Sequence, residues 1–195
     1  MEFNDILIQG LSIVAMIIIV LSFQQKSQKL IIVFQLLGSL LFAIHFGLLG
    51  TMMGCLLNAI NVVRAAIFAD KKRFHTDALP WTVGLLTVYV AAYILTFTLF
   101  GTEPTAKNLI IEALPLISSF FMTFAFRAKT AKGTRILGFG NSPGWLIYNI
   151  VNFSIGGILC EIFAMASIIV GIIRYDILKK PEATPADIQE SSAEA

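Results

Sequence analysis

The chain has 195 residues, of which 57% are hydrophobic and only 13% are charged. A soluble domain carries about 25% charged residues, so this composition excludes an ordinary soluble protein and indicates a membrane protein. The net charge is +2, and the basic residues cluster between apolar stretches, so nucleic-acid binding is not expected. The first ten residues include acidic side chains but no Lys or Arg, so the first apolar stretch is expected to stay as a helix rather than be removed as a signal peptide.

Long apolar stretches follow one another along almost the whole chain. A helix needs about 20 mostly apolar residues to cross the hydrocarbon core, and seven stretches meet this length to within a few residues. They predict an all-α polytopic protein with one transmembrane domain over residues 1–178, followed by a disordered polar tail at 179–195. The stretches are Asp5–Phe23, Leu30–Leu49, Thr51–Ala69, Leu79–Gly101, Asn108–Phe126, Ile136–Phe153, which glycines and Pro143 interrupt, and Ile155–Ile173.

The basic residues set the expected orientation, because cytoplasmic loops are enriched in Lys and Arg. In a seven-span arrangement most of the 14 basic residues fall on one side, Lys107 falls on the other, and Arg64 lies within the third span. The basic side is therefore expected to be cytoplasmic and the N-terminus periplasmic. The residues on the basic side are Lys26, Lys29, Lys71, Lys72, Arg73, Arg127, Lys129, Lys132, Arg135, Arg174, Lys179 and Lys180.

A gapless shift of 103 residues superposes two halves of the chain, residues 5–71 on residues 108–174. Few residues are identical, but polar and aromatic positions coincide. Both halves start on the same side, so we expect two parallel three-helix repeats, with the helix at 79–101 as the linker between them. Parallel repeats that enclose a site at the membrane midplane are a known transporter architecture. The coinciding pairs are Gln9 with Glu112, Phe42 with Trp145, His45 with Tyr148, Gly54 with Gly157, and Asn58 with Glu161.

Three segments carry a family resemblance. The segment WLIYNIVNFSIGGILCEIF, from Trp145 to Phe163, resembles the YgjV-like bacterial inner-membrane proteins. The segments His45–Arg64 and Glu112–Thr130 are similar to the same family. The resemblance covers residues 10–174 and implies a location in the bacterial inner (plasma) membrane, without implying an activity.

The 3+1+3 layout more distantly resembles the SWEET sugar transporters and the wider PQ-loop superfamily. Those proteins carry a Lys–Ser/Thr pair after the first helix of each repeat, which Lys26–Ser27 and Lys129–Thr130 match. They also carry a proline within that helix. Pro115 fits the second repeat, but Ser12 stands in the first, which puts a symmetric hinge in doubt.

The same resemblance implies positions for a binding site. In SWEETs, paired Asn residues on the third helices face the sugar, with aromatic residues from the second helices. The matching positions here are Asn58 and Glu161, with Phe42 and Trp145 as the aromatic candidates. A carboxylate in place of one Asn makes a plain sugar site less expected than a site for another small polar solute.

Glu161 is the most informative single residue, because a carboxylate among apolar neighbours costs several kcal/mol unless it is paired, wetted or protonated. One interpretation is a proton-coupling or cation-coupling group, or a direct substrate ligand. The alternative is a structural partner of Asn58, of His45 or of a backbone donor.

Other polar residues within the spans also have two interpretations. Asn58, Asn61 and Arg64 lie on one helix face and either line a polar cavity or serve as hydrogen-bonding groups, with Arg64 snorkelling to the cytoplasmic surface. His45 is either a pH-responsive group or a hydrogen-bonded packing residue. Asn149 lies in the broken sixth span, where a gate or site is expected because irregular backbone in a membrane lines a cavity or is buried in protein.

No catalytic motif of the types GxSxG or HExxH and no Gly-rich phosphate loop is present, so neither an enzyme nor a cofactor is expected. Cys55 and Cys160 lie in apolar stretches and are expected to be packing residues, since no metal-ligand spacing surrounds them.

The leading hypothesis is a transporter or facilitator of a small polar solute, with a proton as a possible coupling ion. The alternative is a non-transporting accessory or scaffolding subunit. Substrate, direction and a homo-oligomeric state are left open. The candidate substrate-binding residues are Asn58, Glu161, Trp145, Phe42, His45, Tyr148, Asn149 and Asn61.

The predicted orientation has a direct test with compartment reporters. A reporter fused after Lys180 is expected to give a cytoplasmic signal, and one inserted near Glu103 a periplasmic signal, because Lys180 follows an odd number and Glu103 an even number of predicted spans, counted from a periplasmic N-terminus. The same compartment for both fusions would contradict seven spans.

Overall fold

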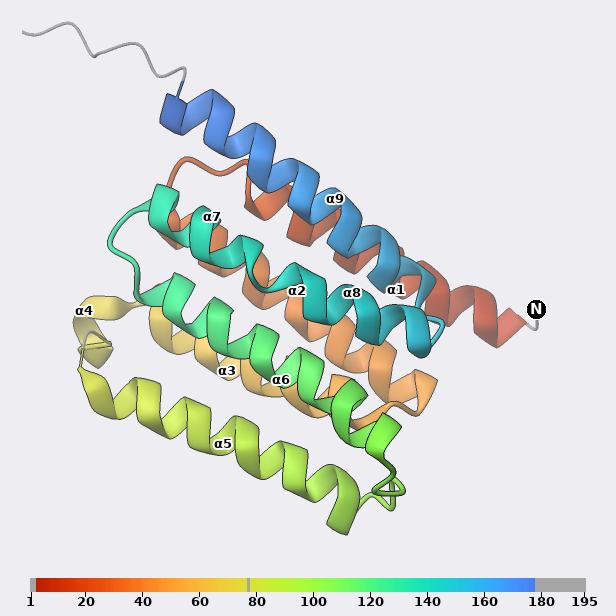
Figure 1. The fold of residues 1–195 in the computed structure, drawn as a ribbon. Helices are drawn as coiled ribbons and strands as arrows, with labels where there is room; N and C mark the ends of the chain where they lie inside the picture. Colours follow the sequence, from red (N-terminus) through yellow and green to blue (C-terminus); the bar gives the residue numbers. More distant parts are fainter. Residues whose placement is uncertain (1–2, 77, 178–195) are drawn as a thin grey trace, which may run out of the picture.

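The computed structural model describes residues 3–76 and 78–177, and the predicted tail at 179–195 lies outside them. The described part is entirely helical and is drawn in Figure 1. Its elements are α1 (Phe3–Ser22), α2 (Gln28–Leu49), α3 (Met52–Ala69), α4 (Lys71–Phe74), α5 (Leu79–Thr98), α6 (Ala106–Arg127), α7 (Ala131–Phe139), α8 (Ser142–Val151), α9 (Ile155–Ile172) and a π-helical continuation of α9, Ile173–Ile177.

Five helices in the described residues are long and apolar enough to cross a membrane by length and composition: α2, α3, α5, α6, and α9 with its continuation. This confirms an all-helical polytopic protein. The apolar part of α1 is shorter, and the sixth predicted stretch forms two short helices, α7 and α8. Gly140 and Asn141 join these two helices, and Pro143 lies in the first turn of α8, where its missing N–H is not needed. Seven complete spans therefore remain a prediction.

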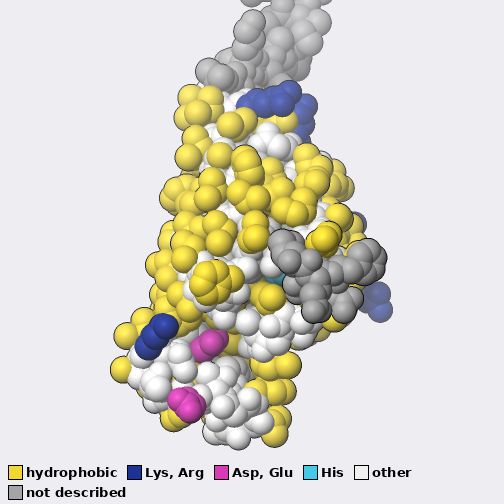
Figure 2. All heavy atoms as spheres, turned by 90° about the vertical axis from the view of Figure 1, so that its right-hand side faces the viewer, with side chains coloured by type: hydrophobic (Ala, Val, Ile, Leu, Met, Phe, Trp, Pro, Cys, Tyr) yellow, Lys and Arg dark blue, Asp and Glu magenta, His cyan; other side chains and the backbone are white. Residues whose placement is uncertain are grey.

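The described helices expose far more apolar surface than a soluble domain does. Large apolar side chains are exposed along every long helix, such as Leu48, Val63 and Ile110. Hydrophobic side chains cover the middle of the face in Figure 2, and charged side chains lie toward its margins. Polar side chains are instead buried, including Arg64 and Arg135. A continuous apolar exterior suits contact with lipid, because monomeric soluble proteins expose only small apolar patches.

The long helices pack in a closed order around a common interior. Each helix in the sequence α1, α2, α3, α6, α8, α9 contacts the next, and α9 returns to α1. The ring is completed by α7, which packs against α6 and α9, while α5 packs on α3 and α6. In Figure 1, α5 lies at the side of the bundle away from α1 and α9. We call the end of the ring that carries the α1–α2, α3–α5 and α6–α7 connections the basic end, because most Lys and Arg residues lie there.

Small residues allow two of these helix pairs to approach closely. A Cβ built on Gly156 of α9 would lie 2.8 Å from the backbone carbon of Ser12 on α1. One on Gly144 of α8 would lie 2.6 Å from the carbonyl oxygen of Leu114 on α6. Close backbone approach through small residues is a common way for helices to associate in a membrane, where lipid gives no hydrophobic drive for packing.

A pair of glycine substitutions tests this packing. Gly156→Ala is expected to lower stability by about 1–3 kcal/mol, because overpacking forces the α1 and α9 backbones apart. Gly84→Ala on α5 is the matched control, since a Cβ there meets nothing within 4 Å, and it is expected to be neutral or to raise stability by about 0.5–1 kcal/mol. Thermal unfolding in detergent measures both, and equal stability of the two variants would contradict the close approach.

Candidate functional site

A polar cavity lies at the centre of the helix ring. Its volume is about 50 Å³, which is room for about three to five water molecules. The lining comes from both halves of the chain, and the polar lining residues are Gln35, Ser39, Asn58, Asn61, Arg64, Asn141, Ser142, Asn149 and Glu161.

Most of the residues predicted for the site lie at this cavity. Two do not line it: His45 and Tyr148 lie next to it and form other contacts. The predicted residues that do line the cavity are Phe42, Asn58, Asn61, Trp145, Asn149 and Glu161.

Glu161 lies on α9 with its side chain half-buried at the cavity. The Ser142 hydroxyl of α8 lies beside its carboxyl group. Of the partners considered from the sequence, Asn58 instead donates from Nδ2 to the carbonyl oxygen of Gly54 at 2.9 Å. Glu161 thus has a neutral neighbour, and its side chain faces the cavity without a basic partner within 4.0 Å among the described residues.

The amide groups at the cavity differ in how well they are satisfied. Asn61 Oδ1 accepts a hydrogen bond from the Tyr89 hydroxyl of α5 at 2.9 Å. Asn149 is buried, and its Oδ1 has no hydrogen-bond partner among the described residues. Because buried polar atoms are nearly always hydrogen-bonded, Asn149 Oδ1 is an acceptor left for a molecule in the cavity.

An aromatic wall forms one side of the cavity. The ring of Phe46 stacks on Phe42 and on Trp145, each at a centroid distance of 5.9 Å. Sequence reasoning selected Phe42 and Trp145 but missed Phe46. It also missed Ser39 and Ser142, although these coincide under the shift of 103 residues and both line the cavity, so the shift could have identified them.

Arg64 does not snorkel to the surface; that alternative is wrong. Its side chain is only 2% exposed. Nη1 donates to the carbonyl oxygen of Ser119 and to the hydroxyl of Tyr89, both at 3.1 Å, and the guanidinium lies 4.7 Å from the Phe126 ring centroid. A cation inside a membrane protein is held in this way by carbonyl oxygens, hydroxyls and aromatic faces. Its Nε has no hydrogen-bond partner among the described residues.

His45 and Tyr148, which coincide under the repeat, fill the ring at the end away from the basic loops. The His45 ring is fully buried, with Nδ1 2.9 Å from the Ile8 carbonyl oxygen and Nε2 2.9 Å from Ser154 Oγ. A carbonyl oxygen only accepts, so Nδ1 donates to Ile8, and in a neutral ring Nε2 accepts from the Ser154 hydroxyl. Ser154 is the N-cap of α9, so His45 of the first half reaches the third helix of the second half.

Tyr148 makes the reciprocal contact. Its hydroxyl oxygen accepts a hydrogen bond from the backbone N–H of Gly54 at 3.0 Å. Gly54 lies in the first turn of α3, where backbone N–H groups have no partner within the helix. The N-cap residue Thr51 does not cap that turn with its own side chain, so Tyr148 of the second half supplies the missing acceptor for the first half.

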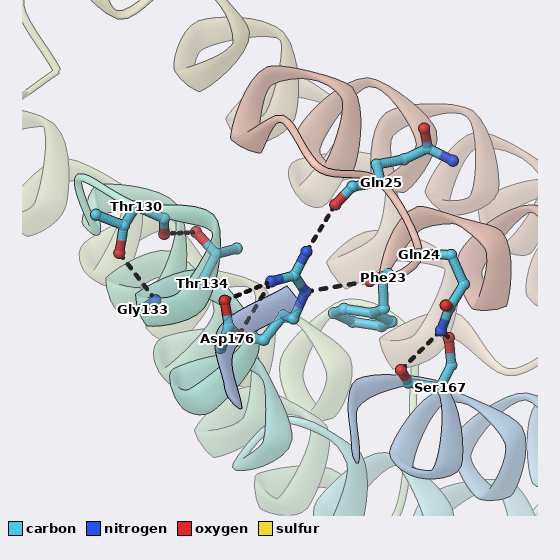
Figure 3. Close-up of polar contacts among 9 residues, drawn as sticks. Phe23, Gln24, Gln25, Thr130, Gly133, Thr134, Ser167 and Asp176 are labelled. Carbon is cyan, nitrogen blue, oxygen red and sulfur yellow. Dashed lines mark hydrogen bonds and ion pairs between the residues drawn. The ribbon is translucent and has the colours of Figure 1, made fainter. Parts of the chain in front are cut away.

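Arg135 lies at the basic end of the ring, and Figure 3 labels its partners Phe23, Gln25 and Asp176. Its side chain is 1% exposed and forms an ion pair with Asp176 at 3.1 Å. Nε donates to the carbonyl oxygen of Phe23 at 3.2 Å, and Nη2 to that of Gln25 at 2.8 Å. The Phe23 side chain lines the cavity. The network therefore connects α7, the α1–α2 loop and the continuation of α9 next to the cavity.

The capping role of Tyr148 is testable with one matched pair of substitutions. Tyr148→Phe is expected to lower stability by about 1–3 kcal/mol, because it leaves the Gly54 N–H buried without an acceptor. Tyr93→Phe is the control, since the Tyr93 hydroxyl donates to the carbonyl oxygen of Leu109, which also accepts a hydrogen bond within α6, so no backbone group loses its acceptor and a change within about 0.5 kcal/mol is expected. Equal losses in thermal unfolding would contradict the cap.

Comparison with known protein families matches residues 6–179 to Imp-YgjV, described as "Bacterial inner membrane protein". The comparisons with curated proteins and with solved structures find no match. The family match covers nearly all of the described helices and confirms the resemblance inferred from residues 145–163. Together with the long apolar helices, it identifies a multi-pass protein of the bacterial inner membrane. The chain therefore belongs to the Imp-YgjV family of bacterial inner membrane proteins.

Proposed function

We propose that the chain is a transporter or facilitator of a small polar solute that passes through the central cavity. The observation that carries the proposal is a cavity at the centre of the helix ring whose polar lining comes from both halves of the chain, with hydrogen bonds between the halves near either end of the ring. Polar lining atoms that the protein leaves without a partner, here Arg64 Nε and Asn149 Oδ1, are costly in a membrane protein unless water, an ion or a solute contacts them. A scaffolding subunit has no need of such an interior.

The two-repeat arrangement is part of the proposal: seven spans, with residues 5–71 and 108–174 as parallel three-helix units and α5 as the linker, as in SWEET-like and PQ-loop-like proteins. Reciprocal packing supports it, because α1 contacts α9 and α6 contacts α3, so the first helix of each half packs on the third helix of the other. The exchanged contacts of His45 and Tyr148 are reciprocal in the same sense. In this arrangement α7 and α8 together take the place of one bent span.

Alternating access follows from closures at the two ends that involve different residues. With the basic end in the cytoplasm, the His45 and Tyr148 contacts form the periplasmic closure and the Arg135 network the cytoplasmic one. Opening either closure gives the solute a path from one side only. Because each closure joins the two halves of the chain, a small rotation of one half against the other breaks one set of contacts and keeps the other.

Within the cavity, the proposed roles follow from residue chemistry. The amides of Asn58, Asn61 and Asn149 offer hydrogen bonds to a polar solute. Phe42 and Trp145 provide an apolar wall that excludes water. Glu161 is the proposed site of proton or cation coupling, since a carboxyl group beside a neutral hydroxyl gains or loses a proton as water enters from either side.

A native cysteine allows a direct test of access. Cys160 is buried and lines the cavity, and Cys55→Ala leaves it as the one remaining thiol, because the chain has 2 cysteines. A small membrane-impermeant cationic methanethiosulfonate reagent is applied to right-side-out and to inside-out vesicles. Modification of Cys160 from both sides is expected, because the cavity opens alternately.

The controls separate access from leakage. Glu103→Cys, at an exposed loop position, placed in a variant without native cysteines, is expected to react fully from one side only. A Cys160 thiol that stays unmodified from both sides until the protein is unfolded would contradict transport and favour the accessory-subunit alternative.

A further inference from the structure

The cavity holds a basic and an acidic side chain that do not form an ion pair with each other. Arg64 lies on α3 and Glu161 on α9, and both line the cavity. Neither forms an ion pair with a described residue within 4.0 Å. Both charges are desolvated by their position in the ring, so the free energy of the protein would fall if they met directly or through a bound solute.

The two side chains have neutral neighbours at different walls of the cavity. Arg64 is bound to Tyr89 of α5 and to the Ser119 carbonyl oxygen of α6. Glu161 lies beside Ser142 of α8. The cavity therefore has a positive pole toward α3, α5 and α6 and a negative pole toward α8 and α9.

Unsatisfied polar atoms accompany both poles. Arg64 Nε is a donor without a partner, on a side chain that is 2% exposed. Asn149 Oδ1 is an acceptor without a partner, on a side chain that is also 2% exposed. A Cβ built on Gly157 would contact Asn149 Oδ1, so this acceptor lies beside α9, one helical turn from Glu161. The donor belongs to the positive pole and the acceptor to the negative pole.

These features together specify a dipolar ligand. An acceptor with negative charge satisfies Arg64 Nε, and a donor with positive charge satisfies Asn149 Oδ1 and Glu161. The volume of about 50 Å³ admits about three to five non-hydrogen atoms, which is the size of glycine and far below the 300–1,000 Å³ typical of pockets for drug-sized ligands.

We infer that the solute is a small zwitterion, an α-amino acid of about the size of glycine, with its carboxylate at Arg64 and its ammonium group at Glu161 and Asn149. This inference rests on the proposed transport function and names its substrate class. The inference gives Arg64 a role in binding the solute. A purely structural arginine would need hydrogen-bond partners for its whole guanidinium group within the protein.

The test compares four probes of nearly equal size: glycine, glycinamide, glycolate and glycolamide. They are a zwitterion, a cation, an anion and a neutral molecule. The readout is protection of Cys160 against the methanethiosulfonate reagent, with the Cys55→Ala protein in lipid nanodiscs. At about ten times its Kd, a bound ligand slows modification about tenfold, because protection follows 1 + [L]/Kd. Glycine is expected to slow the modification of Cys160, and glycinamide, glycolate and glycolamide are not.

Two substitutions are expected to change which of the four probes protects Cys160, if the positive and negative poles are assigned correctly. Glu161→Gln removes the negative pole and is expected to abolish protection by glycine while glycolate protects. Arg64→Gln removes the positive pole and is expected to make glycinamide the better probe. Glu103→Gln and Lys132→Gln are the controls, since both side chains are exposed charges and should leave protection by glycine unchanged. If Arg64→Gln fails to fold, Glu161→Gln and the probe series still decide.

The outcomes also separate this inference from the proposed function. Three outcomes would overturn the zwitterion assignment and leave transport standing. The first is equal protection of Cys160 by glycolamide and by glycine, and the second is protection by glycine that persists in Glu161→Gln. The third is that no probe protects Cys160 although the thiol reacts from both sides. A Cys160 thiol that never reacts would instead overturn the proposed function, and the inference with it.

Discussion

Most polar groups within the helix ring find a partner there, because the outer surface of the helices is apolar and offers none. This constraint explains the packing of α5, whose Tyr89 hydroxyl serves both Asn61 and Arg64. It also explains why His45 and Tyr148 cross between the halves to reach the N-termini of α9 and α3. The helices are held together by satisfied polar groups, since apolar contacts alone give little preference for a neighbouring helix over lipid.

The two buried arginines differ in how their charges are compensated. Arg135 has an acidic partner, Asp176, and two carbonyl acceptors, so its charge is fully compensated and it fixes the basic end. Breaking such a buried pair on one side typically costs about 3–5 kcal/mol. Arg64 has only neutral partners and faces a cavity that also contains Glu161. Its uncompensated charge makes sense as part of a site whose ligand supplies the missing partner.

The sequence predicted the features that depend on local patterns and on the repeat. Helix positions follow from apolar length, so α2 ends at Leu49 and α5 begins at Leu79 as expected. The meeting of Asn58 and Glu161 at one cavity was expected from their coincidence under the repeat. The burial of Arg64 was not predictable in this way, because it depends on Tyr89 of α5, which lies outside the two segments that the shift of 103 residues superposes. The hydrogen bonds of His45 likewise depend on a partner in the other half, which no spacing along the chain indicates.

The central claim, that the two ends of the ring open alternately around the cavity, is tested most directly by electron–electron double resonance on a variant free of native cysteines. One spin-label pair at Leu48 and Phe153 reports the end opposite the basic loops, and a second pair at Lys29 and Lys132 reports the basic end, since all four side chains are exposed. The account predicts two distance populations at each end, with one end wide when the other is narrow. A single narrow population at both ends, unchanged by added glycine, would contradict it.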